Sequence, residues 1–293
     1  MPTLVCASHA KLNLSLRVLR RRPDGYHDIS SVFERISLCD TVRLCAVPGP
    51  SIRFRCASPS VPSGGGNLCV KAALALQRFA PGKGCSITLT KRIPVGSGMG
   101  GGSSNAAAVL TGLARLWRLK ITEKELLETA AGIGSDVPFF VSGCRFGLVT
   151  GRGERIKPFT GRGPTLYHVI LMPCVSVATK GIYDAWDRGN KTPPRRLTTP
   201  GTDATIILQA LKNRDLRALC GGLRNDLESV TGSVYPGIRD AIKQLSQEPE
   251  VAGVSMTGSG AAVFGVFGSK RAQVSCARRL HRGDFRVFCA ETA

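Results

Sequence analysis

The segment Pro94-Val-Gly-Ser-Gly-Met-Gly-Gly-Gly-Ser-Ser-Asn105 decides the fold, because five of its glycines fall within the seven residues 96–102. Glycines let backbone N–H groups approach phosphate oxygens closely, and the N-terminus of a following helix adds partial positive charge. Ser103 and Ser104 stand where hydroxyl groups contact a phosphate or a metal ion. The segment therefore predicts a phosphate-binding loop. The alternative is a flexible glycine linker in which Ser103 only caps the next helix.

The sequence on both sides of this loop supports the first interpretation. Residues 85–93 have the pattern of a strand. Apolar residues at helical spacing follow the loop: Ala106, Val109, Leu110, Leu113, Leu116 and Trp117. A linker seldom leads straight into so strong a helix. The loop is not a Walker A sequence, because it contains no GxxxxGK[ST].

Residues 11–19 alternate between apolar and polar side chains, which is the pattern of a half-buried strand. The apolar side chains are Leu12, Leu14, Leu16 and Val18, and the polar ones are Lys11, Asn13, Ser15 and Arg17. Lys11 and Asn13 therefore lie side by side on one face. The turn Arg22-Pro-Asp-Gly25 follows and leads directly into Tyr26-His27. An aromatic ring beside an imidazole is suited to hold a flat base there, although packing is the commoner role.

Two further segments carry candidate site residues. In Gly134-Ser-Asp-Val-Pro-Phe-Phe140, Asp136 is placed to cap a short helix that begins at Val137. At the rim of a phosphate-binding cleft, the same carboxylate would instead accept a hydroxyl proton. Met256-Thr-Gly-Ser-Gly-Ala-Ala262 is a glycine-rich turn between two strands. It is either a plain hairpin turn or a cover over the nucleotide or the substrate.

Composition narrows the class of protein. The chain has 293 residues, of which 43% are hydrophobic, and its net charge is +20. This excess of Lys and Arg suits a nucleic acid or a polyanionic small molecule as partner. No apolar run reaches the length of about 18 residues that spans a membrane, and residues 1–22 lack the pattern of a signal peptide, so we expect a cytoplasmic protein. The eleven cysteines form no CxxC pair, so we expect reduced thiols that act as small core residues.

Strands and helices are mixed in both halves without regular βαβ alternation, which predicts a two-domain α+β protein. A glycine-rich stretch at 151–163 separates the halves and gives domains of residues 1–155 and 156–293. Further helices are expected at 67–79, at 122–134 behind a Thr122–Glu125 capping box, and at 203–220, 236–246 and 269–281. Further strands are expected at 168–172, 251–256, 261–267 and 285–289, and a polar loop at 187–203.

Taken together, these segments resemble the GHMP kinases, which phosphorylate hydroxyl groups of small molecules with ATP. The resemblance covers nearly the whole chain and includes three family motifs in order: Ala10–Leu14, Pro94–Ala107 and Met256–Ala262. It implies a two-domain fold with the active site in the cleft between the domains. More narrowly, the chain resembles the member whose acceptor is a cytidine diphosphate derivative. The segments that carry this narrower resemblance are Arg22–His27, Gly134–Phe140 and Asn225–Glu228.

The resemblance also implies roles for individual residues. Asp136 would be the general base for the acceptor hydroxyl, and Lys11 beside it would keep the carboxylate ionised. The implied ATP-binding residues are Asn67 and Leu68 near the adenine, and Pro94, Gly96, Gly98, Gly100, Gly101, Gly102, Ser103 and Ser104. The implied substrate-binding residues are Asn13 at the erythritol part, Tyr26, His27 and Tyr183 at the cytosine, and Gly258 and Ser259. Mg²⁺ is expected with ATP, but no residue is assigned as its ligand.

Three other functions compete with this interpretation. A sibling kinase acting on homoserine, mevalonate or a sugar is disfavoured by Pro23–His27. A nucleic-acid-binding module would show an RNP motif, a zinc finger or a clear recognition helix, and the sequence has none, so we expect no nucleic-acid partner. A nucleotide sensor without catalysis is disfavoured because Lys11 and Asp136 are both present. The expected partners are therefore ATP and the small-molecule acceptor, and we expect no binding to a membrane.

Overall fold

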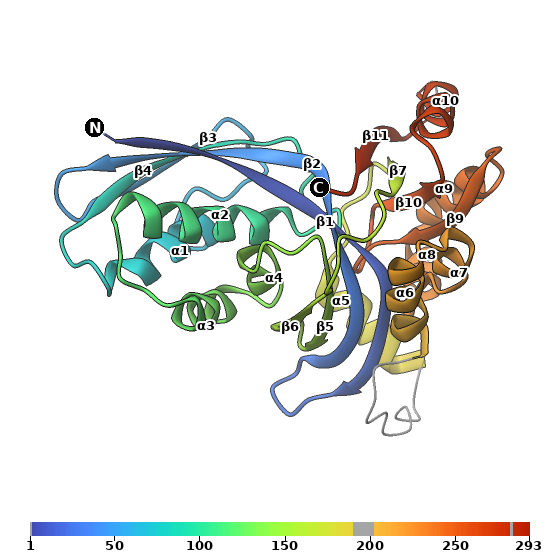
Figure 1. Cartoon of the computed structure of the whole chain (residues 1–293), viewed down its shortest axis with the longest axis horizontal. Coiled ribbons are helices and arrows are strands. Elements are labelled where there is room, and N and C mark those ends of the chain that lie inside the picture. The colour runs from blue at the N-terminus through green and yellow to red at the C-terminus, as the bar shows by residue number, and fades with distance from the viewer. Residues whose placement is uncertain (1, 190–201, 282–283) are drawn as a thin grey trace.

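The computed structural model describes residues 2–189, 202–281 and 284–293, which form two sheets with helices packed around them (Figure 1). The elements of the first half are β1 (Thr3–Arg21), β2 (His27–Val47), β3 (Ile52–Cys56), α1 (Leu68–Gln77), β4 (Gly84–Thr90), α2 (Gly101–Leu116), α3 (Glu123–Ile133), α4 (Val137–Val141), β5 (Phe146–Gly151) and β6 (Arg155–Pro158). The elements of the second half are β7 (Tyr167–Met172), α5 (Thr179–Gly189), α6 (Thr202–Asn213), α7 (Leu216–Gly221), β8 (Arg224–Asn225), α8 (Glu228–Val234), α9 (Pro236–Ser246), β9 (Val251–Met256), β10 (Val263–Phe267), α10 (Lys270–Leu280) and β11 (Arg286–Glu291).

The larger sheet has seven strands, with the order β3-β4-β2-β1-β8 and with β5 and β6 added beside β2. The long antiparallel pair β1 and β2, drawn in blue in Figure 1, runs from the left of the view, where the N-terminus lies, and bends down to the hairpin at the bottom. Helices α1 and α2 lie on one face of this sheet (Figure 1). The smaller sheet, β11-β7-β10-β9, is built wholly from the second half. The mixed architecture confirms the predicted α+β class.

Strand β1 differs from its predicted half-buried character. Lys11 and Asn13 are only 3% and 2% exposed, although they lie on its polar face. Loops from elsewhere in the chain pack against this part of β1. The Lys11 backbone N–H donates to the Met99 carbonyl and the Asn13 N–H donates to the Thr257 hydroxyl, both at 3.0 Å, and a Cβ atom at Gly100 would lie 3.1 Å from the Lys11 side chain. The alternation in the sequence indicates which side chains share a face. It does not indicate that a second layer of chain covers the polar one.

Most helices lie close to their predicted ranges. The helix expected at 67–79 is α1, and its N-cap Asn67 accepts from the Cys69 N–H at 2.8 Å. The capping box at the start of α3 is formed as predicted. The single helix expected at 203–220 is wrong, because the chain forms α6 and α7 instead. Arg214 breaks the helix with a φ of 55°, and Asp215 caps α7.

Two sequence-based boundaries need separate treatment. The polar loop expected at 187–203 lies mostly outside the described residues, and its described ends are helical, in α5 and α6. The domain boundary after residue 155 falls inside β6, which pairs with β5 in the larger sheet. Strand β8 of the second half also pairs with β1. The larger sheet therefore draws on both halves, and the division into 1–155 and 156–293 stays a prediction.

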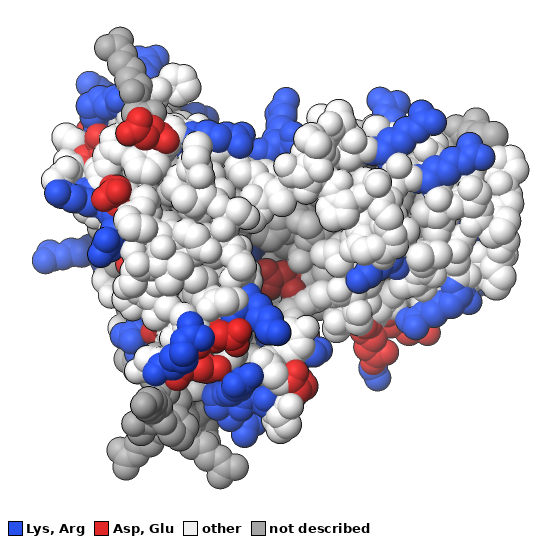
Figure 2. All heavy atoms as spheres, turned by 180° about the vertical axis from the view of Figure 1, so that it is seen from behind, with Lys and Arg blue, Asp and Glu red and all other residues white. Residues whose placement is uncertain are grey.

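Most cysteines lie outside the core, and the basic side chains do not form one binding patch on the face that Figure 2 shows. All eleven cysteines are free thiols, but only Cys69, Cys85 and Cys276 are buried, so the expected core role holds for a minority. Figure 2 shows Lys and Arg spread over the visible face, not gathered in one patch. None of the described helices is long and apolar enough to cross a membrane.

Candidate active site

Two cavities adjoin each other at the glycine-rich loop. The small cavity, of about 320 Å³, lies between this loop and the start of α1. The large cavity, of about 810 Å³, lies between β1, α5 and the turn after β9. Gly98 and Gly100 line both cavities. The loop is therefore the wall that the two cavities share.

The small cavity brings together nearly all residues predicted to bind ATP. Its lining includes Asn67, Leu68, Pro94, Gly96, Gly98, Gly100, Gly101, Gly102 and Ser103. Ser104 lies outside this lining, because it is only 3% exposed and its hydroxyl accepts a hydrogen bond from Ser8 at 2.7 Å. Lys91, which the sequence patterns did not indicate, lines the cavity and pairs with buried Asp40 at 2.5 Å.

The loop needs glycine for two physical reasons. Gly96, Gly98 and Gly100 have φ values of 70°, 75° and 69°, in the left-handed region that other residues rarely adopt. A Cβ atom at Gly98 would overlap the Thr257 carbonyl, and one at Gly100 would lie 3.1 Å from the Phe140 ring. Backbone curvature and close packing therefore both exclude larger residues.

The loop is also held in place, so the flexible-linker alternative is wrong. The Ala262 N–H donates to the Ser97 carbonyl at 3.1 Å, and the Ser97 hydroxyl donates to the Pro94 carbonyl at 2.8 Å. Helix α2 begins directly after Gly100, which is its N-cap, so Ser103 lies in the first turn and is not the cap. This first turn, with its free backbone N–H groups, lines the small cavity and favours an anion there.

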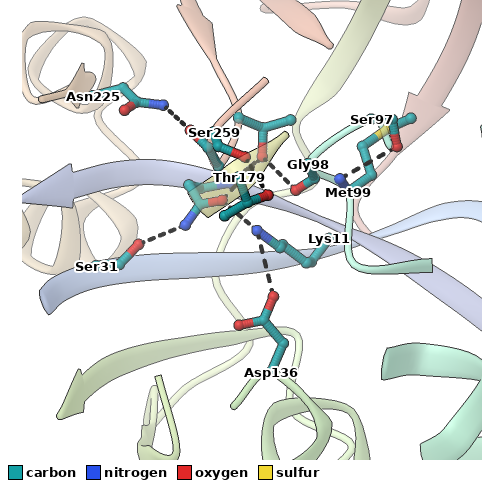
Figure 3. Close-up of polar contacts among 12 residues, drawn as sticks. Lys11, Ser31, Ser97, Gly98, Met99, Asp136, Thr179, Asn225 and Ser259 are labelled. Atoms are coloured by element: carbon teal, nitrogen blue, oxygen red, sulfur yellow. Dashed lines mark hydrogen bonds and ion pairs between the residues drawn. The ribbon is translucent and has the colours of Figure 1, made fainter. Parts of the chain in front are cut away.

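Lys11 and Asp136 face each other in the large cavity, with 3.8 Å between Nζ and Oδ2 (Figure 3). The Lys11 ammonium donates to the Asn13 amide oxygen and lies 4.6 Å from the centroid of the Phe33 ring. Burial lowers the pKa of Lys11, and the neighbouring Asp136 carboxylate opposes that shift. The Asp136 side chain is 29% exposed, so a ligand in the cavity has access to it.

Asp136 has the position of a helix cap without the function of one. It is the N-cap residue of α4, yet its side chain makes no capping hydrogen bond. Its carboxylate points toward Lys11 instead (Figure 3). The capping alternative therefore explains where the residue lies, but not where its side chain points. A carboxylate that lines the large cavity beside a buried ammonium has the chemistry of a general base, and that role for Asp136 stays a prediction.

The turn Met256–Ala262 connects the antiparallel pair β9 and β10, as the hairpin alternative requires, and it also contacts β1 and the phosphate loop. Thr257 is fully buried, and its hydroxyl accepts from the Asn13 N–H and donates to the Asn13 amide oxygen, each at 3.0 Å. Backbone hydrogen bonds join the turn to the phosphate loop. Gly258 and Ser259 line the large cavity, as their predicted role requires. That they contact a ligand stays a prediction.

The three residues predicted to hold a base also line the large cavity. Tyr183 stacks on His27, with 4.9 Å between ring centroids and 23° between planes. Tyr26 is 56% exposed, and the Arg152 guanidinium lies 5.1 Å from its ring centroid. The His27 Nε2 atom lies 2.8 Å from Asp187 Oδ1. Burial raises the pKa of the Tyr183 hydroxyl, so this residue stays neutral.

The sequence patterns missed several charged residues of the large cavity and its rim. Arg152 and Lys180 belong to its lining, and Asp187 contacts the lining residue His27. Asp187 had a usable signal, because it follows Tyr183 by four residues, which is one turn of a helix. Helix α5 itself was not predicted, although its two buried residues, Ile182 and Trp186, have the i, i+4 spacing of an amphipathic helix and were a usable signal.

Comparisons with known proteins agree with one another. The pattern described as GHMP kinases N terminal domain matches residues 67–144, and the one described as GHMP kinases C terminal matches residues 207–284. Two proteins named 4-diphosphocytidyl-2-C-methyl-D-erythritol kinase are each 39% identical to the chain. The one from Geobacter sulfurreducens aligns over 100% of both chains, and the one from Bacillus pumilus over 96% of this chain and 92% of its own.

Solved structures extend the same likeness. A crystal structure of 4-(cytidine 5'-diphospho)-2C-methyl-D-erythritol kinase matches 98% of both chains with a TM-score of 0.77 and 32% identity. A homoserine kinase from Cytophaga hutchinsonii covers 100% of this chain and 95% of its own, with a TM-score of 0.75. That enzyme is only 18% identical, so it shows a shared fold and nothing about the acceptor.

Proposed function

The chain belongs to the GHMP kinase family, and we propose that it transfers the γ-phosphoryl group of ATP to the 2-hydroxyl of 4-diphosphocytidyl-2-C-methyl-D-erythritol. This step belongs to the non-mevalonate route to isoprenoid precursors, and the enzyme is a phosphotransferase with an alcohol acceptor. Full-length relatives at 39% identity are named for this kinase. The structural observation that carries the proposal is the Lys11–Asp136 pair, which lies beside the loop where the two cavities meet.

ATP occupies the small cavity in this proposal. Its phosphates lie against the backbone N–H groups of residues 96–103, with the N-terminus of α2 adding partial positive charge. The adenine lies near Asn67 and Leu68, at the start of α1. Because Gly98 and Gly100 also line the large cavity, a γ-phosphate at this wall faces the acceptor directly. Phosphoryl transfer depends mostly on such positioning and on electrostatic stabilisation.

The acceptor hydroxyl lies beside Asp136, which takes its proton as the oxygen attacks the γ-phosphorus. Lys11, 3.8 Å away, favours the ionised carboxylate and stabilises negative charge on the transferring group. Asn13 was predicted to bond the erythritol part, but its amide oxygen accepts from Lys11 and its amide nitrogen donates to Ser31 at 2.9 Å. These contacts favour a role in holding Lys11. A direct contact with the substrate stays a prediction.

The cytosine lies at the aromatic end of the large cavity, near Tyr26, His27 and Tyr183. In the neutral imidazole that this proposal requires, the His27 Nε2–H donates to Asp187 and Nδ1 is left as an acceptor. An acceptor suits the exocyclic amino group of cytosine, whereas uracil presents a carbonyl oxygen at that position. The hydrogen bond between His27 and Asp187 therefore supports recognition of a cytidine derivative over a uridine derivative.

Mg²⁺ accompanies ATP in this chemistry and neutralises phosphate charge. In the part of the chain that the structure describes, no three His, Cys, Asp or Glu side chains come together as a metal site. We assign Mg²⁺ no protein ligand.

The test is ADP release by the purified chain with ATP and a panel of acceptors. The panel contains 4-diphosphocytidyl-2-C-methyl-D-erythritol, mevalonate, homoserine and galactose. We expect the rate with the cytidine compound to exceed each of the others by at least about 100-fold, because buried groups built for one acceptor reject those that lack its partners. A higher rate with any other acceptor would identify a sibling kinase instead. ADP release with none would refute the proposed function.

A further inference from the structure

Asn225 lies outside both cavity linings, and its side chain is used entirely on backbone groups. Its amide nitrogen donates to the carbonyls of Met256 and Gly258, at 2.7 and 2.8 Å. Its amide oxygen accepts from the Leu227 N–H at 3.0 Å. Asn225 is 8% exposed and lies on β8, where it pairs with Leu16 of β1. One side chain therefore fastens the turn after β9 to the strand that carries Lys11 and Asn13.

A second side chain of the segment Asn225–Glu228 forms hydrogen bonds to the start of the turn after β9. Glu228, in the first turn of α8, accepts from the Met256 N–H at 2.8 Å and from the Ser255 hydroxyl at 3.3 Å. The backbone N–H and C=O of Met256 are thus both held, one by Glu228 and the other by Asn225. The beginning of the turn has little freedom to move relative to β8.

The turn that these residues hold leads directly to the proposed base. Thr257 exchanges two hydrogen bonds with Asn13, and the Asn13 amide oxygen also accepts from the Lys11 ammonium. Lys11 in turn lies 3.8 Å from Asp136. Consecutive contacts therefore connect Asn225 to the Lys11–Asp136 pair, although Asn225 itself touches neither residue.

We infer that Asn225 is a positioning residue for phosphoryl transfer. It fixes the turn so that the Thr257 hydroxyl holds Asn13, and thereby Lys11, at the right place beside Asp136. The inference rests on the proposed function, since it assigns Lys11 and Asp136 to the reaction. The role requires two N–H donors at one point, which Asn supplies. Asp has the same size, but its carboxylate would oppose two carbonyl oxygens without a hydrogen to share.

The main test is Asn225→Asp, assayed for kcat, for KM of ATP and for thermal stability. We expect kcat to fall by about tenfold or more, the effect of losing a buried hydrogen-bond donor. The KM for ATP should stay within about threefold, since Asn225 does not line the small cavity. The matched control is Asn213→Asp on α6, where Asn213 is exposed and its amide oxygen accepts from Gln209. The control should keep the parent kcat.

A double-mutant cycle with Thr257→Val separates positioning from general damage to the fold. If Asn225 acts through Thr257, the double variant has about the same kcat as Thr257→Val alone, because the pathway is already broken. Losses in kcat that multiply would overturn the inference, as would an Asn225→Asp variant with the parent kcat. Where Asn225→Asp does not fold, Asn225→Ala replaces it in the same cycle, since it removes the donor without adding charge.

A pH series supplies a signature that packing damage alone would not give. Lowering the pH protonates the new carboxyl group, which then donates one hydrogen bond. The ratio of the Asn225→Asp kcat to the parent kcat should rise as the pH falls, and a flat ratio would contradict the inference. All variants are assayed with whichever acceptor of the panel releases ADP. A wrong assignment of the acceptor can therefore be distinguished from a wrong assignment of Asn225 as a positioning residue.

Discussion

The two cavities beside the phosphate loop are built from different parts of the chain. The small cavity is lined largely by the backbone of the glycine-rich loop and by the start of α1. The large cavity is lined by side chains with charge or aromatic rings, among them Lys11, Asp136, Tyr26 and Tyr183. The difference suits the two ligands proposed for them. Backbone N–H groups serve phosphates that every ATP-dependent kinase shares, whereas side chains discriminate one acceptor from another.

This contrast predicts where substitutions will act. Side-chain truncation in the large cavity should change the reaction or the acceptor affinity and leave ATP binding intact. Addition of a side chain in the small cavity should do the opposite. The shared wall at Gly98 and Gly100 is less informative, because a Cβ atom at either position also meets neighbouring chain within 3.1 Å.

The largest effect is expected for Asp136→Asn, which keeps the size of the side chain and removes the base. We expect kcat to fall roughly 10²–10⁴-fold, the range for loss of a general base. The melting temperature should also fall, because the substitution leaves the buried Lys11 ammonium without its counter-charge, although no capping hydrogen bond is lost. Steady-state kinetics and a thermal melt measure both quantities. A kcat within a few-fold of the parent would remove Asp136 from the reaction.

Loss of either tyrosine ring should weaken binding of the cytidine substrate and leave ATP binding unchanged. Stacking of a base on an aromatic ring contributes about 1–3 kcal/mol, so Tyr26→Ala or Tyr183→Ala should raise its Kd by roughly 5- to 150-fold. Tyr26→Phe is the control, because it keeps the ring. Calorimetric titration with the cytidine substrate and with an ATP analogue gives both affinities. If both ligands weaken equally, the rings only support packing.

Gly102→Val should weaken ATP binding without disturbing the fold. Gly102 lies in the first turn of α2 with ordinary helical geometry, and a Cβ atom there would meet only Leu68, at 3.7 Å. The added side chain enters the small cavity, so we expect the KM for ATP to rise by about tenfold or more. Gly132→Val, on an exposed helical position with no neighbour within 4 Å, is the matched control. An unchanged KM would place the nucleotide elsewhere.

The smallest effect concerns the choice of base. His27→Ala removes the acceptor that Asp187 orients, so the preference for the cytidine over the uridine substrate should fall by about 2- to 10-fold, the worth of one hydrogen bond. The ratio of kcat/KM for the two substrates measures it. A variant that loses activity on both substrates in equal proportion would show that His27 only supports Tyr183.

Local patterns were sufficient to predict the parts of the site that lie within one segment. The loop at 94–105, the pairing of Lys11 with Asn13 on one strand face and the Thr122–Glu125 capping box each depend on residues close in sequence. The same holds for the strands and helix between residues 251 and 291, which lie near their predicted ranges. Family resemblance supplied the roles proposed for Asp136 and for the aromatic residues.

Contacts between distant segments were not readable from the sequence. The burial of Lys11 depends on the loops at Met99 and Thr257, which no alternation pattern reports. The Ser104 hydroxyl faces Ser8, because the helix begins at Gly101 and turns that side chain into the core. The family resemblance pointed to the segment of Asn225, and its amide oxygen accepts locally from the Leu227 N–H. No local pattern indicates that its amide nitrogen holds a turn more than thirty residues away.

One crossed titration tests the central claim, that the two cavities bind different ligands through different parts of the chain. The parent, Gly102→Val and Tyr183→Ala are each titrated with a non-hydrolysable ATP analogue and with the cytidine substrate. We expect Gly102→Val to raise the Kd of the ATP analogue by about tenfold or more and to leave the Kd of the cytidine substrate within about twofold of the parent value. Tyr183→Ala should do the reverse. Equal losses for both ligands in either variant, or a reversal of the pattern, would contradict the account.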